Sequence, residues 1–219
     1  AEINLLPSDA LAFSVTGRYA EDEYFKSQLG LQSSRTAGAT FFGSWTFGES
    51  AANLSAHYGW DETNSRQSGS TAFAAPDWSG VTEDTQHSGG ITLRLPSVTA
   101  RLALGLDLFF ADTDGEVTTS SSTSPAGSLP QLRTRMNGAE LTGEYRWSPA
   151  LTLRAAARYE HFDADDWQLD GVEPATVPTL LSLGADAYDY DVTLFELAFT
   201  YRFGAAAPAD TEESDAPSE

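Results

Sequence analysis

The sequence predicts an all-β protein: an antiparallel, up-and-down transmembrane β-barrel with eight full strands. Three observations support this prediction. Eight segments of about ten residues alternate apolar and polar side chains with period two, as strands with two different faces do. The connections alternate between short turns and long polar stretches, and aromatic residues gather at the ends of the apolar faces. The segments are residues 11–20, 36–47, 53–61, 91–95, 101–110, 140–147, 151–160 and 195–203.

In the first four segments, alternate positions are apolar or glycine. The large apolar residues are Leu11, Phe13, Val15 and Tyr19, then Phe41, Trp45 and Phe47, then Leu54, Tyr58 and Trp60, and then Ile91, Leu93 and Leu95. Serine, threonine, histidine and arginine occupy most positions between them, for example Thr16, His57 and Arg94. Successive side chains of a strand point to opposite faces, so each segment predicts one apolar and one polar face.

The last four segments repeat the pattern. Their large apolar residues are Leu102, Leu104, Leu106, Leu108 and Phe110, then Leu141, Tyr145 and Trp147, then Leu151, Leu153 and Tyr159, and then Phe195, Leu197, Phe199, Tyr201 and Phe203. Residues 2–6 form a further apolar stub, which we interpret as the end of a preceding strand entering a turn at Pro7. Because single-chain barrels of this class normally have an even number of strands, the stub suggests that further strands precede it.

The connections between the segments differ in length. The predicted short turns are residues 7–10, 48–52, 97–99 and 148–150, and the predicted long loops are residues 21–35, 62–87, 113–133 and 163–190. Short turns at one end and long loops at the other are typical of outer-membrane barrels. Residues 204–219 are rich in Pro, Ala and acids without apolar periodicity, which predicts a disordered acidic tail after a barrel domain of residues 1–203.

A soluble barrel is the alternative, and the charges on the polar faces decide against it. These faces carry Arg18, Arg94, Arg101, Arg146, Arg154, Arg158 and Arg202 together with Asp61, Asp107, Glu140, Glu144, Glu160 and Glu196. A dry interior would desolvate so many charges at great cost, whereas a wet or partner-filled lumen would not. The final Tyr201-Arg-Phe203 also resembles the terminal aromatic signal by which bacterial barrels are recognised for insertion.

The composition excludes several classes of function. The 219 residues contain 32 acids and 12 bases, and the resulting net charge of −20 disfavours binding to nucleic acid because phosphate repels an acidic protein. The chain has no cysteine, so it has no disulfide and no covalently attached haem. No signal peptide opens the chain, which predicts a mature protein or one that begins partway through a longer chain.

No catalytic or metal-binding constellation stands out. No common nucleophile, phosphate-binding or metalloprotease motif occurs, and His57, His87 and His161 lie on different segments. The acidic residues at 163–166 and 186–191 lack the spacing of an EF-hand, so we expect solvated loops rather than a calcium site. The residues themselves therefore predict no enzyme, no metal centre and no bound cofactor.

Loop residues carry a resemblance to a known family. The stretch Tyr159 to Gly171, with Trp167-Gln-Leu-Asp-Gly171 at its end, followed by residues 181–192 and the final Tyr201-Arg-Phe203, resembles the C-terminal portion of the MtrB/PioB family. Pro7-Ser-Asp-Ala-Leu, Leu29-Gly-Leu-Gln and Leu129-Pro-Gln-Leu-Arg resemble hairpins of the same family, so the resemblance covers residues 1–203.

This resemblance implies a location and a role. Members of the family are decahaem-associated barrels of the bacterial outer membrane, with well over twenty strands, which sheathe a periplasmic multihaem c-type cytochrome and often dock an extracellular one. The implied function is electron transfer across the outer membrane, with haem on the partner and none on this chain. The N-terminal part of the family is absent from this sequence. The chain is therefore interpreted either as part of a larger barrel or as a reduced relative. A passive porin or small structural barrel without a redox partner is the alternative function.

If a cytochrome is sheathed, it must touch the polar faces, because lipid covers the apolar ones. The candidate contacts are Arg94, Arg101, Glu140, Glu144, Arg146, Arg154, Arg158, Glu160, Glu196 and Arg202. The alternative is that these charges only pair with each other across neighbouring strands.

Overall fold

The protein is an all-β sheet, as the sequence predicts. The computed structural model describes residues 1–72, 74–121, 124–165 and 189–203. Its strands are β1 (Glu2–Ser8), β2 (Leu11–Glu23), β3 (Gly30–Phe47), β4 (Ala52–Gly69), β5 (Trp78–Thr99), β6 (Leu102–Ser121), β7 (Ser124–Ser128), β8 (Leu132–Arg146), β9 (Leu151–Asp165) and β10 (Tyr190–Tyr201). Among these residues no helix is long and apolar enough to cross a membrane.

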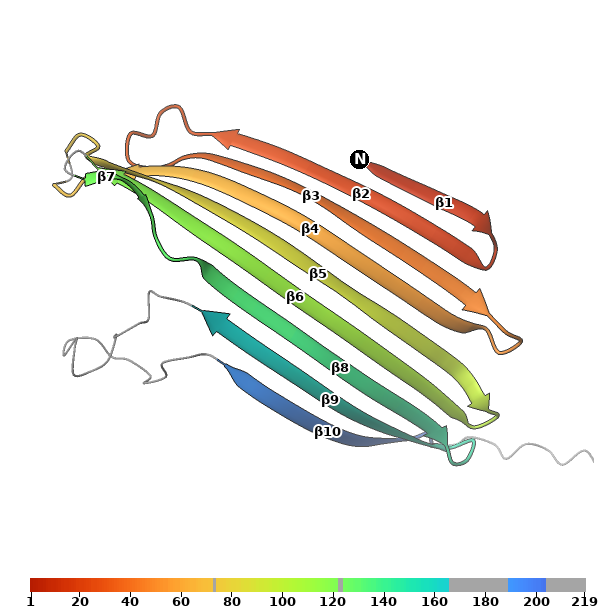
Figure 1. Ribbon diagram of the computed structural model, residues 1–219. Coiled ribbons are helices and arrows are strands. Elements are labelled where there is room, and N and C mark those ends of the chain that lie inside the picture. The colour runs from red at the N-terminus through yellow and green to blue at the C-terminus, as the bar shows by residue number, and fades with distance from the viewer. Residues whose placement is uncertain (73, 122–123, 166–188, 204–219) are drawn as a thin grey trace, which may run out of the picture.

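The strands form one antiparallel sheet in chain order. Each of β1 to β6 pairs with the next, β6 pairs with β8, and β8 continues to β9 and β10, while the short β7 folds back onto β6. Figure 1 shows a single curved layer with the β1–β2, β3–β4, β5–β6 and β8–β9 turns at one end, here called the short-turn end. The opposite end is called the long-loop end.

The described sheet is open. Its two edge strands are β1 and β10, and the hydrogen-bonded path runs from one to the other without closing among the described residues. The stub predicted at residues 2–6 is β1, and it pairs antiparallel with β2. A membrane barrel leaves no edge strand unpaired, because lipid offers no partner for backbone groups.

The register confirms the two predicted faces. One hydrogen-bonded row joins Trp45, Leu54, Leu93, Leu106 and Leu141 on neighbouring strands, all on one side of the sheet. We call this side the apolar face. The adjacent row, one residue along each strand, lies on the other side, the polar face. The polar row comprises Ser44, Ser55, Thr92, Asp107 and Glu140.

The sheet has no hydrophobic core. Ala52 is the one buried apolar residue in the described part of the chain. Large apolar side chains are instead exposed, most of all on β10, where Phe195, Leu197 and Phe199 are 81%, 80% and 76% exposed. A single layer of this kind gains little from internal packing, so its apolar face needs an apolar environment such as lipid.

The apolar face is staggered across the sheet. The row that contains Leu11, at the short-turn end of β2, passes through β3, β4, β5, β6, β8 and β9 and reaches Phe195 on β10. On β10 the apolar face continues to Tyr201, which lies 201 − 195 = 6 residues farther toward the short-turn end. Strands of membrane barrels are tilted, and tilt requires a stagger from strand to strand.

For three of the predicted long loops, the prediction of a loop is wrong. Residues 21–35, 62–87 and 113–133 are largely strand, so that β3, β4, β5 and β6 contain 18, 18, 22 and 20 residues. Crossing a bilayer takes about 9–11 residues of tilted strand, so these strands extend well beyond the apolar face at the long-loop end. We call this extension, residues 30–36, 62–69, 78–87, 112–121 and 132–136, the collar.

The physical reason for this difference is the environment of the collar. Both of its faces are polar, so it shows no apolar alternation, although the backbone pairing continues without interruption through Asp84–Gly115 and Glu83–Glu116. In the fourth predicted loop β9 runs on to Asp165 and β10 begins at Tyr190. The rest of that loop and the predicted tail at 204–219 lie outside the described residues.

Candidate functional site

The candidate site is the polar face of the sheet, where most of the predicted charged residues meet. The register places Arg158 opposite Glu140, Arg154 opposite Glu144 and Arg146 opposite Thr152. Glu196 of β10 lies on the same face, opposite Ala156. Arg101 and Arg202 flank the strands at the short-turn end rather than lying within them.

Some of these charges pair with each other. Arg94 binds Asp107 with an Nη1–Oδ2 distance of 2.8 Å, and Arg158 binds Glu160 at 2.6 Å and Glu140 at 4.0 Å. Each guanidinium is more than 40% exposed, so each pair is expected to contribute only up to about 1 kcal/mol. Arg94–Asp107 and Arg158–Glu140 join neighbouring strands, as the alternative of pairing within the wall expects, whereas Arg158–Glu160 lies within β9.

Other charges remain unpaired. In the described part of the chain, Arg101, Arg146, Arg154 and Arg202 form no ion pair, and neither do Glu144 and Glu196. Arg154 stays unpaired although Glu144 lies directly across from it. The unpaired arginines lie toward the short-turn end, whereas the paired Arg158 lies farther along β9.

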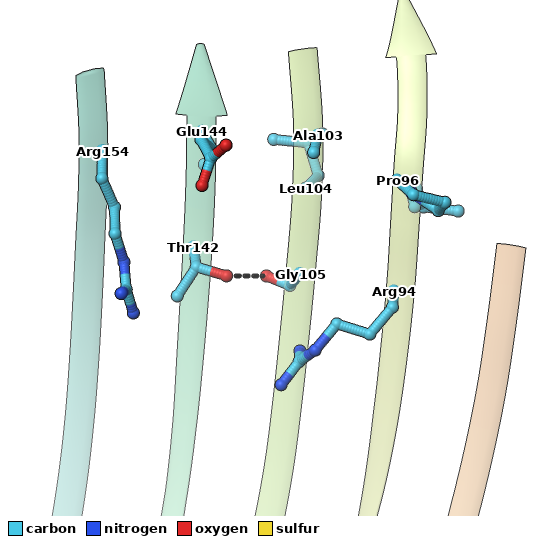
Figure 2. A pocket seen from close by; sticks show the side chains of 10 residues that line it. Arg94, Pro96, Ala103, Leu104, Gly105, Thr142, Glu144 and Arg154 are labelled. Carbon is cyan, nitrogen blue, oxygen red and sulfur yellow. Dashed lines mark hydrogen bonds between the residues drawn. The ribbon is translucent and has the colours of Figure 1, made fainter. Parts of the chain in front are cut away.

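A hollow of about 250 Å³ lies among these residues on β5, β6, β8 and β9. Figure 2 shows Arg94 extending from β5 toward Gly105 on β6, while Arg154 extends along β9 toward the level of Thr142. Thr142 donates a long hydrogen bond, 3.4 Å, to the Gly105 carbonyl. Pro96 also lines the hollow. It lies at a bulge of β5, a position where a strand tolerates proline.

Gly105 leaves room for the present positions of the Arg94 and Thr142 side chains. A Cβ built there would lie 2.5 Å from the Thr142 hydroxyl and 2.8 Å from Nη1 of Arg94. Without that carbon, the Arg94 side chain can lie across β6 and reach Asp107 on the same strand. The hollow therefore combines one guanidinium that Asp107 holds in place and one that is free.

Two aromatic residues on the polar face were not predicted. Phe42, His57, Gly90, Phe109 and Gly138 follow one another in a single hydrogen-bonded row. The ring of Phe109 occupies the space above Gly138, and the Arg158 guanidinium lies 5.4 Å from the ring centroid. The adjacent pairs Phe41-Phe42 and Phe109-Phe110 could have predicted these two residues. In a strand only one of two adjacent residues can face lipid, so the other must lie on the polar face.

The collar carries a separate set of charges, in the register of the apolar face. Arg133 lies 3.4 Å from Asp112 and 3.3 Å from Asp114, and Arg135 lies 3.7 Å from Asp112. On the opposite side of the collar, partial burial raises the pKa of the Asp84 carboxyl. Charges on both sides mark the collar as a part of the sheet that lies in water rather than in lipid.

The histidines do not converge. His57 lies on the polar face beside Gly90, His87 shares a 2.6 Å hydrogen bond with the Tyr58 hydroxyl, and His161 lies 3.0 Å from Asp191. Across the described ranges no group of three or more His, Asp or Glu side chains could hold a metal ion. Part of the two acidic loop segments, including Asp166 and Asp186, lies outside those ranges.

Comparison with known proteins agrees with this geometry. The model of the family described as "outer membrane beta-barrel porin, MtrB/PioB" matches residues 1–203. A relative from Shewanella baltica (strain OS185), named Outer membrane protein MtrB, is 21% identical over 203 residues. That match covers 92% of this chain but 29% of the relative, so the chain spans less than a third of the relative's length.

Proposed function

Because this chain belongs to the MtrB/PioB family of outer-membrane β-barrel porins, we propose that it forms part of a barrel wall sheathing a periplasmic multihaem c-type cytochrome. The wall would hold the cytochrome and insulate it from lipid during electron transfer across the outer membrane. The chain itself is an outer-membrane protein whose apolar face contacts lipid.

The observation that carries the proposal is the uncovered polar face. It presents both signs of charge, a hollow and two phenylalanine rings, and the described chain places no second layer over it. A purely water-filled lumen explains the charges but gives no reason for Phe42, which is 41% exposed on this face. A protein inside the barrel would cover both the charges and the rings.

The role proposed for this chain is structural. It has no cysteine, so it cannot attach haem covalently, and we propose that all haem of the assembly is carried by the partner. An extracellular multihaem cytochrome would meet the collar, which extends from the membrane at the long-loop end. Tyr201 and Phe203, whose rings lie 4.8 Å apart at the end of β10, are the residues proposed as the insertion signal.

A passive porin is the second candidate. The described ion pairs on the polar face, Arg18–Asp61, Arg94–Asp107 and Arg158–Glu160, favour it, because charges satisfied within the wall need no partner. In that case, water and small solutes would occupy the lumen.

Purification of the complete protein tests the two candidates. Extracted from the outer membrane in mild detergent, a sheath is expected to retain a haem-staining cytochrome in fixed stoichiometry. Reconstituted in liposomes, the complex should then pass electrons from an external reductant to an enclosed dye. A barrel that purifies without haem and makes the liposomes permeable to small sugars would contradict the sheath and support the porin.

A further inference from the structure

We propose that the hollow between Arg94 and Arg154, with the arginines at its short-turn rim, is a docking site for an acidic surface of the protein that occupies the polar face. This inference rests on the proposed function and specifies where and by what chemistry the partner is held. It divides the ten predicted contact residues into a part that stabilises the wall and a part that is open to a partner.

The free guanidinium of Arg154 is the first observation. Arg154 faces Glu144 across a hydrogen-bonded pair of strands, a position at which opposite charges usually meet, yet no ion pair joins them. Figure 2 shows the side chain turned away from the level of Glu144 and toward that of Thr142. The arginine thus presents its donors to the hollow rather than to its neighbour.

The second observation is the preorganised Arg94 on the other side of the hollow. One carboxylate oxygen of Asp107 accepts a hydrogen bond from Nη2 of Arg94 at 3.0 Å, and the other lies 2.8 Å from Nη1 as an ion pair. A guanidinium has five donors, so this contact leaves others available for an incoming carboxylate. Gly105 keeps the floor between the two arginines open, since a side chain there would collide with Arg94 and Thr142.

The third observation is the rim. The backbone amide of Arg146 donates to the Arg101 carbonyl at 2.8 Å, and that of Arg202 donates to the Ala150 carbonyl at 2.8 Å. These bonds bring three more arginines to the short-turn end of β6, β8 and β10. Of the 12 basic residues of a protein of net charge −20, two therefore line the hollow together with Glu144, and three more lie beyond it at the short-turn end.

The occupant follows from the balance of the unpaired charges. In the described part of this end of the polar face, four arginines (Arg101, Arg146, Arg154 and Arg202) and two glutamates (Glu144 and Glu196) form no ion pair, which leaves an excess of positive charge. A partner that covers the polar face removes water from it, and a desolvated guanidinium is costly unless a carboxylate pairs with it. Arginine forms bidentate contacts with carboxylates, which fix orientation as well as charge. Glutamate and aspartate side chains on the partner's surface satisfy both requirements.

The test uses the complete protein in detergent and a fluorescent hexaglutamate peptide as the probe. The wild-type barrel should bind the peptide, with an affinity that falls as salt is added. The variant Arg94→Gln/Arg154→Gln should bind at least about ten-fold more weakly, since two charge-assisted contacts are lost. The control Arg35→Gln/Arg66→Gln removes the same two charges from the collar and should bind like the wild type.

Equal peptide affinity in the wild type and the hollow variant, or no binding by the wild type, would overturn the proposal. Should the double variant fail to fold, Arg154→Gln alone decides, because the wild-type Arg154 makes no ion pair in the described structure on which folding could depend. Co-purification of the cytochrome is measured separately. Peptide binding that depends on the arginines, with no cytochrome retained, would keep the docking site and refute the sheath.

Discussion

At the scale of single residues, glycines determine how the polar face is organised. Arg18 of β2 and Asp61 of β4 form an ion pair, with an Nε–Oδ1 distance of 2.8 Å, across the intervening strand β3. The pair crosses β3 above Gly38, the residue that lies between them in the hydrogen-bonded row. In the same way, the Arg94 side chain lies above Gly105 and the ring of Phe109 lies above Gly138. Long side chains can therefore lie flat on this face wherever the neighbouring strand has no Cβ.

Gly38→Ala is expected to separate Arg18 from Asp61, because the new methyl group would collide with the Asp61 carboxylate. The Arg18 side chain is 62% exposed, so the loss in unfolding free energy should be about 1 kcal/mol or less. The matched control is Gly17→Ala on β2, where the added carbon meets nothing within 4 Å. Urea unfolding of the complete protein in lipid vesicles measures both, and equal stability of the two variants would contradict the role of Gly38.

At the scale of the strand, the two faces of each element face different surroundings. On β9 the side chain of Ala155 lies in the row of Gly143 and Leu197 on the apolar face, whereas that of Ala156 lies in the row of Thr142 and Glu196 on the polar face. Adjacent residues of the same type are thus assigned to lipid and to the lumen. Adding the same charge at each of the two positions and comparing the stability of the variants tests this difference.

Ala155→Arg is expected to destabilise the barrel by about 2–4 kcal/mol, the cost of arginine near the middle of the bilayer on the lipid-facing side. Ala156→Arg should cost no more than about 1 kcal/mol, since its side chain reaches a polar lumen. Both variants are measured by unfolding in lipid vesicles and by the amount of folded protein recovered from the outer membrane. The assignment of faces would be reversed if Ala156→Arg proved the more damaging change.

At the scale of the whole molecule, the sheet consists of a staggered apolar band with a polar collar at the long-loop end. Trp45 and Trp147 lie at the short-turn side of the band, Trp60 lies near its long-loop side, and Trp78 lies in the collar. Trp45 and Trp147 are 49% and 62% exposed, as interfacial aromatic residues are when lipid is absent. The band therefore has an aromatic border on both sides.

Fluorescence quenching should locate these borders. In variants that keep one tryptophan each, a nitroxide near the lipid headgroup is expected to quench Trp45, Trp60 and Trp147 more strongly than a nitroxide deep in the acyl chains. Trp78 should respond to neither, because the collar lies in water. Quenching of Trp78 by either lipid would show that the collar is embedded and that the boundary between the apolar band and the collar is wrong.

The sequence by itself determined which residues cross the membrane and which way their side chains point. The rows that contain Leu54, Leu106 and Leu141 could be predicted because lipid on one side and polar surroundings on the other impose period two on the residues. The positions of the β1–β2, β3–β4 and β8–β9 turns and the stub at residues 2–6 followed from the same alternation and from turn residues such as Pro7. The turn predicted at residues 97–99 was wrong, because β5 continues to Thr99 past the bulge at Pro96 and the turn lies at residues 100–101.

Only the tertiary structure decided the collar, the pairing of charges and the free arginines of the hollow. Where both faces of a strand are polar, as at Glu83 and Asp84, the sequence leaves no alternation, and only the backbone hydrogen bonds to Gly115 and Glu116 identify a strand. Likewise, Arg154 and Arg158 are equivalent in the pattern. In the described structure Arg158 is paired and Arg154 is free, because pairing depends on side-chain direction and on neighbours contributed by other strands.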